Sequence, residues 1–181
     1  LRKEKLDDQQ AITAVHESGH AVLSSILMRT IPVSVFSVTA DNYSLGFVLA
    51  RPEWNYVSKA EIINRLAVLF GGLEAERLIF GDENITIGAS QDLLSATRLA
   101  TYVLYSCGFG EAPAAYGNTN MNETPTIIFD AEVSSLNGDA KEMLVAAQQL
   151  AAKTLKEQRV LLLQMANYLS DKRMLDKSSV K

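Results

Sequence analysis

The helix that organises this chain is predicted by one run of residues, Ala14-Val15-His16-Glu17-Ser18-Gly19-His20-Ala21-Val22-Leu23-Ser24-Ser25-Ile26, in which a His-Glu-x-x-His pattern lies among periodic apolar residues. On an α-helix, residues i and i+4 lie one above the other, so His16 and His20 converge on one point. Two imidazoles at that separation can hold Zn²⁺ together with a third protein ligand and a water. Glu17 is displaced by about 100° around the helix from His16, which suits a base beside the metal.

The alternative interpretation of this pattern is an ordinary helix whose two histidines lie on its surface or are satisfied in the core. The chain contains two histidines in all, and both stand in the pattern, on either side of Glu17. Chance placement rarely produces that coincidence, so the sequence favours a metal site.

Length and composition indicate a folded globular protein. With 181 residues, 48% of them hydrophobic and 21% charged, the chain is expected to form one domain with a sizeable core. The net charge of −4 and the lack of a basic stripe argue against nucleic acid as a partner. No uncharged apolar run reaches the roughly 18 residues of a membrane span, so we expect neither a span nor a signal peptide within this sequence.

The first part of the chain is predicted to combine the histidine-bearing helix with two short strands. Asp7 or Asp8 can cap the helix, which we expect to run to about Arg29. Residues 33–38 alternate apolar and polar side chains, as a half-buried strand does, and residues 45–49 read as a second strand. The sequence therefore predicts a small β-hairpin or sheet beside the helix.

A second helix is predicted from the capping box Ser58-Lys59-Ala60-Glu61 to about Phe80. This helix would contain Gly71-Gly72, and each glycine inside a helix costs roughly 1 kcal/mol relative to alanine. The pair is understandable if another backbone, such as that of the histidine-bearing helix, packs closely against it.

The second half of the chain is predicted to be mainly helical. Ser90 can cap a helix that ends at about Cys107, before Gly108, and residues 110–126 read as a flexible loop. Residues 138–175 keep a helical apolar period, which more often reflects packing than an interaction face. Cys107 is the single cysteine, so no internal disulfide can form, and its apolar neighbours predict a buried thiol.

Together these elements predict an α+β fold that is mostly α-helical, with a zinc-binding helix, a small β-hairpin or sheet and a C-terminal helical bundle. A zinc site needs a third ligand, and no third histidine exists, so the candidates are Glu61, Glu74, Glu76 and Asp92. Asp92 stands in the first turn of a predicted helix, where free N–H groups favour the ionised carboxylate that zinc requires. Acidic residues are common at helix starts, so spacing alone does not distinguish Asp92 from Glu76.

Three motifs in order resemble the peptidase domain of the FtsH-type zinc metalloproteases, which are membrane-anchored and ATP-dependent. They are His16-Glu17-Ser18-Gly19-His20, then Gly71-Gly72-Leu73-Glu74-Ala75-Glu76-Arg77-Leu78-Ile79-Phe80-Gly81, and then Gly88-Ala89-Ser90-Gln91-Asp92-Leu93. The resemblance extends from about residue 7 to residue 175. It is specific because it rests on three separate motifs.

The resemblance implies a zinc-dependent endopeptidase in which His16, His20 and Asp92 bind the metal and Glu17 is the catalytic base. Zinc would lower the pKa of its water toward 7 and polarise the peptide carbonyl, while Glu17 takes the proton and returns it to the leaving amine. Glu76 matches a family glutamate close to the site, which implies that it orients a ligand.

The family also implies partners. Its members are hexamers in which an AAA+ ATPase ring unfolds protein substrates, including damaged membrane proteins, and threads them into a peptidase chamber. This chain has no Gly-x-x-x-x-Gly-Lys-Ser/Thr phosphate loop, so we interpret residues 1–8 as a linker from an upstream ATPase domain and residues 9–181 as the peptidase domain. The parent protein would be membrane-anchored, with this soluble part on the cytoplasmic, mitochondrial-matrix or chloroplast-stromal side.

The substrate is expected to be an extended polypeptide that adds as a strand along the edge formed by Gly46, Phe47 and Val48. Several positions depart from the usual family pattern and bear on substrate preference, namely Ser18 for alanine, Ile87 for threonine, Gly110 for serine and Asp41-Asn42-Tyr43 for a Pro-Arg-Gly-like turn. None of them removes a predicted zinc ligand.

Two other functions stay open. One is a proteolytically inactive scaffold that keeps the fold to hold an assembly together, and the other is a zinc hydrolase of small molecules. The intact Glu17 argues against the scaffold, because a dead site has no chemical need of a base. An open, strand-lined groove would distinguish the endopeptidase from the small-molecule hydrolase.

Overall fold

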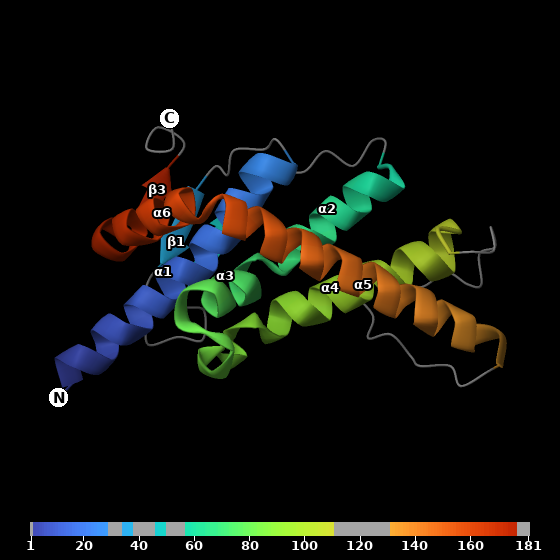
Figure 1. The fold of residues 1–181 in the computed structure, drawn as a ribbon, viewed down its shortest axis with the longest axis horizontal. Helices are drawn as coiled ribbons and strands as arrows, with labels where there is room; N and C mark the ends of the chain where they lie inside the picture. The colour runs from blue at the N-terminus through green and yellow to red at the C-terminus, as the bar shows by residue number, and fades with distance from the viewer. Residues whose placement is uncertain (1, 29–33, 38–45, 50–56, 111–130, 177–181) are drawn as a thin grey trace.

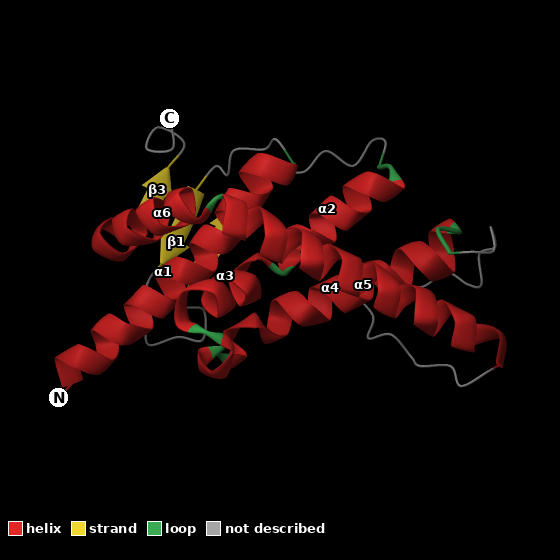
Figure 2. Ribbon diagram, viewed as in Figure 1, coloured by secondary structure: helices red, strands yellow, loops and turns green. Residues whose placement is uncertain are grey.

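The computed structural model describes residues 2–28, 34–37, 46–49, 57–110 and 131–176, and this part of the chain is mainly α-helical, as predicted (Figure 2). The helices are α1 (Arg2–Leu27), α2 (Lys59–Leu69), α3 (Gly71–Phe80), α4 (Ser90–Cys107), α5 (Ala131–Glu157) and α6 (Arg159–Lys172). The strands are β1 (Ser34–Ser37), β2 (Gly46–Leu49) and β3 (Met174–Asp176), and two short 3₁₀ turns, η1 (Asp82–Asn84) and η2 (Ile87–Ala89), connect α3 to α4.

Helix α1 crosses the molecule diagonally and packs against α3 and α6, while the long α5 lies across α2, α3 and α4 (Figure 1). One apolar core joins these helices. The largest fully buried side chains that the helices contribute to it come from five of them and are Val22, Leu23, Leu66, Leu104, Leu155, Leu162 and Leu169, and strand residue Val35 belongs to the same core. Burial of this apolar area is what holds the helices together, since short helices are marginal on their own in water.

A three-stranded antiparallel sheet lies beside α1. β1 is the central strand, with Phe36 opposite Phe47 of β2 on one side and opposite Met174 of β3 on the other. Among the described strands, β2 and β3 are therefore the edges of the sheet. Residues 38–45, which connect β1 to β2, lie outside the described residues.

The predicted helix from residue 58 to 80 is in fact two helices. The capping box is confirmed, because the Ser58 hydroxyl accepts from the Glu61 N–H and the Ser58 N–H donates to the Glu61 carboxylate. The chain turns at Phe70, whose N–H donates to the carbonyls of both Leu66 and Ala67. This shared bond tightens the last turn of α2 and ends the helix there, so that Gly71 opens α3.

Two predicted helix starts are wrong. α1 begins at Arg2, so Asp7 and Asp8 lie inside the helix and do not cap it. The Lys, Glu, Leu and Gln residues around them are good helix formers, which explains the earlier start. Ser90 is the first residue of α4 and not its cap, because the turn η2 leads into the helix and the cap position is Ala89.

The late helical region also differs from the prediction. It is divided at Gln158, whose φ of −100° and ψ of 22° separate α5 from α6, and Leu175 belongs to β3 and not to a helix. The reason is that residues 174–176 pair with β1, a contact between distant parts of the sequence. Gly108 ends α4 at a φ of 68°, as predicted, whereas Cys107 is exposed in the last turn and not buried.

Two predictions fall on other parts of the chain. Of the loop predicted at residues 110–126, all but Gly110 lies outside the described residues, as does the turn predicted at residues 41–43. No helix in the described part of the chain is both long enough and apolar enough to traverse a lipid bilayer.

Candidate metal centre

The middle of α1 carries His16, Glu17 and His20, and all three side chains are buried, with 9%, 6% and 8% of their surface exposed. Because the two histidines are four residues apart on a helix, their rings lie on one face, with centroids 4.9 Å apart. That face is turned toward α3, so the histidine pair sits inside the protein and not on its surface.

Helices α1 and α3 approach each other so closely that their backbones touch. A methyl group at Gly71 would lie 2.8 Å from the backbone nitrogen of His20, and one at Gly19 would overlap the Gly71 carbonyl. A methyl group at Gly72 would overlap the imidazole of His16. The close packing that the two glycines predicted is therefore present, and the α3 backbone forms the floor on which the His16 ring rests.

The structure brings Asp92, from the first turn of α4, to the same point as the two histidines. The Nε2 atoms of His16 and His20 are 3.2 Å apart, and Asp92 Oδ2 lies 3.2 Å from the first and 3.3 Å from the second. Three atoms with lone pairs thus form a nearly equilateral triangle. Asp92 keeps 27% of its side chain exposed, so this corner of the triangle is the one nearest to solvent.

The other nitrogen of each ring is held by a hydrogen bond. His16 Nδ1 donates to Glu76 Oε1 at 2.7 Å, and His20 Nδ1 donates to the Val68 carbonyl oxygen at 2.7 Å. A carbonyl oxygen can only accept, so the His20 proton resides on Nδ1. Both rings are consequently oriented with Nε2 toward the triangle, as in metal sites where a carboxylate or carbonyl orients the histidine ligand.

The residues fit a zinc ion. In a tetrahedral site with zinc–ligand distances of about 2.0–2.1 Å, neighbouring ligand atoms lie roughly 3.3–3.4 Å apart, close to the separations observed here. Two imidazole nitrogens and one carboxylate oxygen are a usual donor set for a catalytic zinc site with a fourth position free. Three facing lone pairs repel one another, and a cation at their centre removes that repulsion.

The electrostatics of these side chains agree with the geometry. Burial alone would lower the pKa of His16, but hydrogen bonds with Asp92 and Glu76 raise it from 6.5 to about 9. Burial alone would raise the pKa of Asp92, yet its contacts with His16 and His20 hold it well below its usual range. A proton therefore occupies His16 when no metal is bound, and a bound cation would take its place.

Glu17 differs from the other acidic groups of the site because no described residue forms a hydrogen bond with its carboxylate. Burial raises its pKa, and the nearby His20 and His16 partly offset that effect. A buried carboxylate with a raised pKa and no hydrogen bond from the described residues is suited to accept a proton from a group at the triangle.

The other acidic candidates lie elsewhere. Glu61 belongs to the capping box at the start of α2, and Glu74 is buried in an ion pair with Arg77 while accepting a 2.8 Å hydrogen bond from Gln148. Glu76 contacts Nδ1 of His16 and not Nε2, so it supports a ring instead of facing the triangle.

Of the other predicted residues, Gly46, Phe47 and Val48 form most of the edge strand β2. The family departures lie in different settings, since Ile87 is 93% exposed while Ser18 is fully buried, with a hydroxyl that finds no hydrogen-bond partner among the described residues.

Three supporting residues were not found from the sequence. Gly72 makes room for the His16 ring, the Val68 carbonyl orients His20, and Thr86 donates to Glu76 through its N–H at 2.7 Å. The glycine pair did signal a close contact, but not which side chain would fill it. A backbone carbonyl leaves no signal in sequence, and Thr86 is ten residues from the carboxylate that it contacts.

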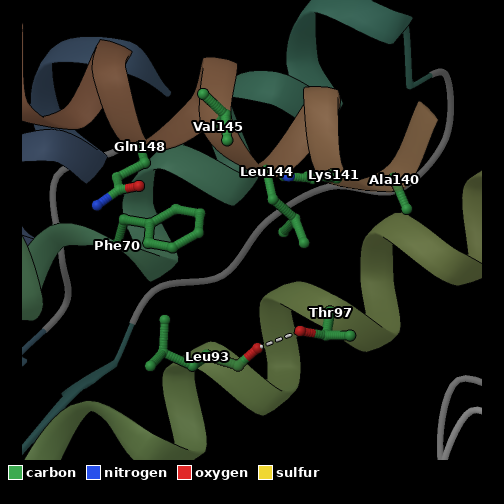
Figure 3. Close-up of a pocket in the computed structure, with 8 residues that line it drawn as sticks. All are labelled: Phe70, Leu93, Thr97, Ala140, Lys141, Leu144, Val145 and Gln148. Carbon is green, nitrogen blue, oxygen red and sulfur yellow. Dashed lines mark hydrogen bonds between the residues drawn. The ribbon is translucent and has the colours of Figure 1, made fainter. Parts of the chain in front are cut away.

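A pocket of about 390 Å³ opens between α4 and α5. Figure 3 shows Phe70 and Leu144 on one side of it and Leu93 and Thr97 on the other. Leu93 directly follows Asp92 in sequence, but neither the three triangle residues nor Glu17 lines the pocket. Its walls are mostly apolar and contribute no further metal ligand.

Comparison with known proteins identifies the family to which the chain belongs. The profile of peptidase family M41 matches residues 4–181. The chain is 33% identical to the ATP-dependent zinc metalloprotease FTSH 11, chloroplastic/mitochondrial, of Arabidopsis thaliana, over 97% of this chain and 21% of that protein. It is 34% identical to the ATP-dependent zinc metalloprotease FtsH of Neorickettsia risticii, over 83% of this chain and 24% of that protein.

A third relative is the ATP-dependent zinc metalloprotease YME1L of Drosophila melanogaster, at 33% identity over 78% of this chain and 21% of that protein. The chain thus spans about a fifth to a quarter of the length of these relatives. With a family profile that matches nearly all of its residues, the chain belongs to peptidase family M41.

Proposed function

We propose that this chain is a zinc-dependent endopeptidase domain that cleaves unfolded polypeptides. The observation that carries the proposal is the triangle of His16 Nε2, His20 Nε2 and Asp92 Oδ2, with sides of 3.2, 3.2 and 3.3 Å, beside the buried carboxylate of Glu17. The names of the relatives, which are zinc metalloproteases, support the same metal and the same class of reaction.

Each residue of the site has a distinct role in this proposal. His16, His20 and Asp92 hold the ion, Glu76 orients His16, and the α3 backbone at Gly72 keeps the His16 ring in place. When bound, zinc would lower the pKa of its water toward 7 and polarise a peptide carbonyl. Glu17 accepts the proton and delivers it to the departing amine, for which its raised pKa is suited.

The proposed substrate is an extended chain that pairs with β2 through Gly46, Phe47 and Val48. β2 lies at an edge of the described sheet, with β1 on one side only, so its second row of backbone N–H and C=O groups is available to another strand. Pairing through the backbone accepts many sequences, which suits an enzyme that degrades unfolded proteins. It also favours an endopeptidase over a hydrolase of small molecules.

The proposed partners come from the relatives, which are described as ATP-dependent and are several times longer than this chain. We propose that an AAA+ ATPase domain precedes residues 1–8 in the parent chain, that the assembly is a homo-hexamer, and that it processes unfolded or damaged membrane proteins. The parent would be anchored in a membrane, with this domain on the cytoplasmic, matrix or stromal side.

The test compares two substitutions that separate metal binding from catalysis. Asp92→Ala removes a proposed ligand and should release most of the zinc, whereas Glu17→Gln should keep stoichiometric zinc because Glu17 is not a ligand. Cleavage of unfolded casein by Glu17→Gln should nonetheless fall by about 10²–10⁴-fold, as expected when a general base is lost. Glu61→Gln, an exposed change at the start of α2, is the control for both measurements.

The metal is measured by elemental analysis of the purified variants, and cleavage by release of labelled peptides. Zinc retained by Asp92→Ala would remove that residue from the ligand set. Unchanged casein cleavage by zinc-loaded Glu17→Gln would favour a different base, and absence of cleavage by the wild-type hexamer with its ATPase would favour the inactive scaffold.

A further inference from the structure

Thr86 lies between the two parts of the chain that build the metal centre. It follows η1 and precedes η2 in the connection from α3, which carries Glu76, to α4, which carries Asp92 (Figure 1). The side chain is half-buried, and its hydrogen bonds extend in both directions along the chain. Nothing in the sequence patterns or in the relatives' names assigns it a role.

The first set of bonds reaches Glu76, the carboxylate that orients His16. The Thr86 N–H donates to Glu76 Oε2 at 2.7 Å, and the Thr86 hydroxyl donates to Glu76 Oε1 at 3.2 Å. Oε1 is also the atom that accepts from His16 Nδ1. Among the described residues, Thr86 thus supplies two of the three hydrogen bonds to a carboxylate that is only 1% exposed.

The remaining bond reaches the turn that places Asp92. The Thr86 hydroxyl oxygen accepts from the Gly88 N–H at 3.1 Å and so caps the start of η2, the turn that directly precedes α4. The cap position of α4, Ala89, has no side chain able to hold the first turn of the helix. The orientation of that turn, where Asp92 stands, therefore depends on η2 and on the residue that anchors it.

We propose that Thr86 is a positioning residue of the metal centre, whose hydroxyl joins the carboxylate that orients His16 to the turn that places Asp92. This inference rests on the proposed function, because it assigns Thr86 a role toward the same ion. An isolated capping threonine would explain the bond from Gly88, but it would not explain the two bonds to buried Glu76. The side chain of Thr86 thereby couples the two proposed ligands His16 of α1 and Asp92 of α4, which are 76 residues apart in sequence.

The decisive variant is Thr86→Val, which keeps the shape and the backbone N–H but removes the hydroxyl and both of its bonds. We expect its zinc dissociation constant to rise by about tenfold, at the lower end of the 10–100-fold typical of a lost supporting hydrogen bond. Thr86→Ser keeps the hydroxyl and should restore binding close to the wild-type value. Thr97→Val is the matched control, because its hydroxyl bonds only within α4, to the Leu93 carbonyl.

Zinc affinity is measured by competition with a chromogenic chelator, and the visible absorption of the Co²⁺-substituted proteins reports the ligand geometry. Thr86→Val should alter this spectrum, while Thr86→Ser and Thr97→Val should not. Thr86→Ala removes the same hydroxyl with a smaller side chain, so agreement between it and Thr86→Val excludes a steric effect. Thermal unfolding of the chelator-treated proteins verifies that each variant folds.

The outcomes separate this inference from the function on which it rests. If Asp92→Ala loses zinc while Thr86→Val and Thr86→Ala bind it as the wild type does, with the same Co²⁺ spectrum, the inference is wrong and the proposed function stands. If Thr97→Val weakens zinc binding as much as Thr86→Val, the specific role of Thr86 is also refuted. A wild-type protein that binds no zinc would overturn both.

Discussion

The contact between α1 and α3 is so tight that even one added methyl group would overlap a neighbouring atom, whereas the contact between α4 and α5 leaves a pocket of about 390 Å³. Both contacts lie within one small protein, and α3 and α4 each carry an acidic residue of the candidate site, Glu76 and Asp92. At the first, Gly72 lies against the His16 ring. At the second, apolar side chains such as Leu93 and Leu144 line the open space (Figure 3).

The difference follows from what each contact must position. A metal or catalytic group must be held to within about 0.5 Å, and backbone packed against backbone is stiffer than side chains that can change rotamer. The α1–α3 contact holds His16, His20 and Glu76, whereas α4 brings only Asp92, through its first turn. Close packing is therefore concentrated where the positions of the ligands depend on it.

The largest expected difference between the two contacts is electrostatic and appears when zinc is removed with a chelator. The pKa of His16 rises from 6.5 to about 9 on folding. The stabilisation of the folded state by the protonated His16 ring is therefore complete below pH 6.5 and is lost as the pH rises through 9. At about 1.4 kcal/mol per pKa unit, the free energy of unfolding should fall by roughly 3 kcal/mol over this interval. Denaturant titrations at several pH values measure it.

The zinc-loaded protein is the control, since the metal then occupies the place of the His16 proton and the fall should be absent. Asp92 does not contribute to this window, because its pKa is lowered and its stabilisation is lost only in acid. A chelator-treated protein of constant stability between pH 6.5 and 9 would contradict the proposed ion pair.

The next largest effect is expected for Gly72→Ala. An alanine inside a helix normally gains roughly 1 kcal/mol over glycine, but the added methyl would overlap the His16 ring, and overpacking of this kind costs about 1–3 kcal/mol. We expect loss of stability together with at least about tenfold weaker zinc binding, because the ring must move. Chemical denaturation and chelator competition measure the two effects.

Gly138→Ala supplies the matched comparison for that substitution. Gly138 also lies within a helix, α5, but a methyl group there would meet nothing within 4 Å. This variant should gain roughly 1 kcal/mol and leave zinc binding unchanged. Equal stability changes in the two glycine variants would show that the α1–α3 contact is not as tight as its geometry indicates.

A smaller effect, of opposite sign, is expected for Ser18→Ala on α1. The Ser18 hydroxyl is fully buried and has no hydrogen-bond partner in the described part of the chain, so its removal should raise the free energy of unfolding by about 1 kcal/mol. Ser25→Ala is the control, because the Ser25 hydroxyl donates to the Ala21 carbonyl at 2.9 Å and its loss gives no such gain. Thermal unfolding compares them, and a destabilised Ser18→Ala would point to a partner for the hydroxyl.

The smallest effect is expected at the α4–α5 contact. Ala140 lines the pocket, so Ala140→Leu places its larger side chain in open space and should change stability by less than about 0.5 kcal/mol. Zinc binding should be unaffected, because Ala140 lies on α5 and touches no ligand. A loss of more than 1 kcal/mol in denaturant titrations, at the level of overpacking, would mean that this contact is as restrictive as that of α1 and α3.

Much of the candidate site could be predicted from local sequence. The spacing of His16 and His20 places both rings on one helical face whatever surrounds them, because the helical period is a property of the backbone. The glycine pair at 71 and 72 is unfavourable in an isolated helix, so it predicted a close neighbour. The capping box at Ser58 is likewise a contact between residues three apart, and the structure contains it.

Other predictions failed where backbone hydrogen-bond geometry, distant residues or solvent decide the outcome. The break at Phe70 depends on a hydrogen bond shared between two carbonyls, and the strand at residues 174–176 exists because it pairs with β1. Cys107 has apolar neighbours in sequence, yet it stands in the last turn of α4, beyond buried Leu104, where it is exposed. Local composition does not determine any of these.

The sequence by itself determined that a histidine pair and an adjacent glutamate would share one helix, and it reduced the candidates for the third ligand to a few carboxylates. Only the tertiary structure decided between them, by placing Asp92 against both Nε2 atoms and Glu76 against Nδ1 of His16. The physical reason is that the two nitrogens of one imidazole ring point in different directions, so each nitrogen can contact a different carboxylate. Which carboxylate meets which nitrogen depends on how α3 and α4 pack on α1. Thr86 lies between α3 and α4 in the chain, and its N–H donates to the carboxylate of Glu76, ten residues earlier.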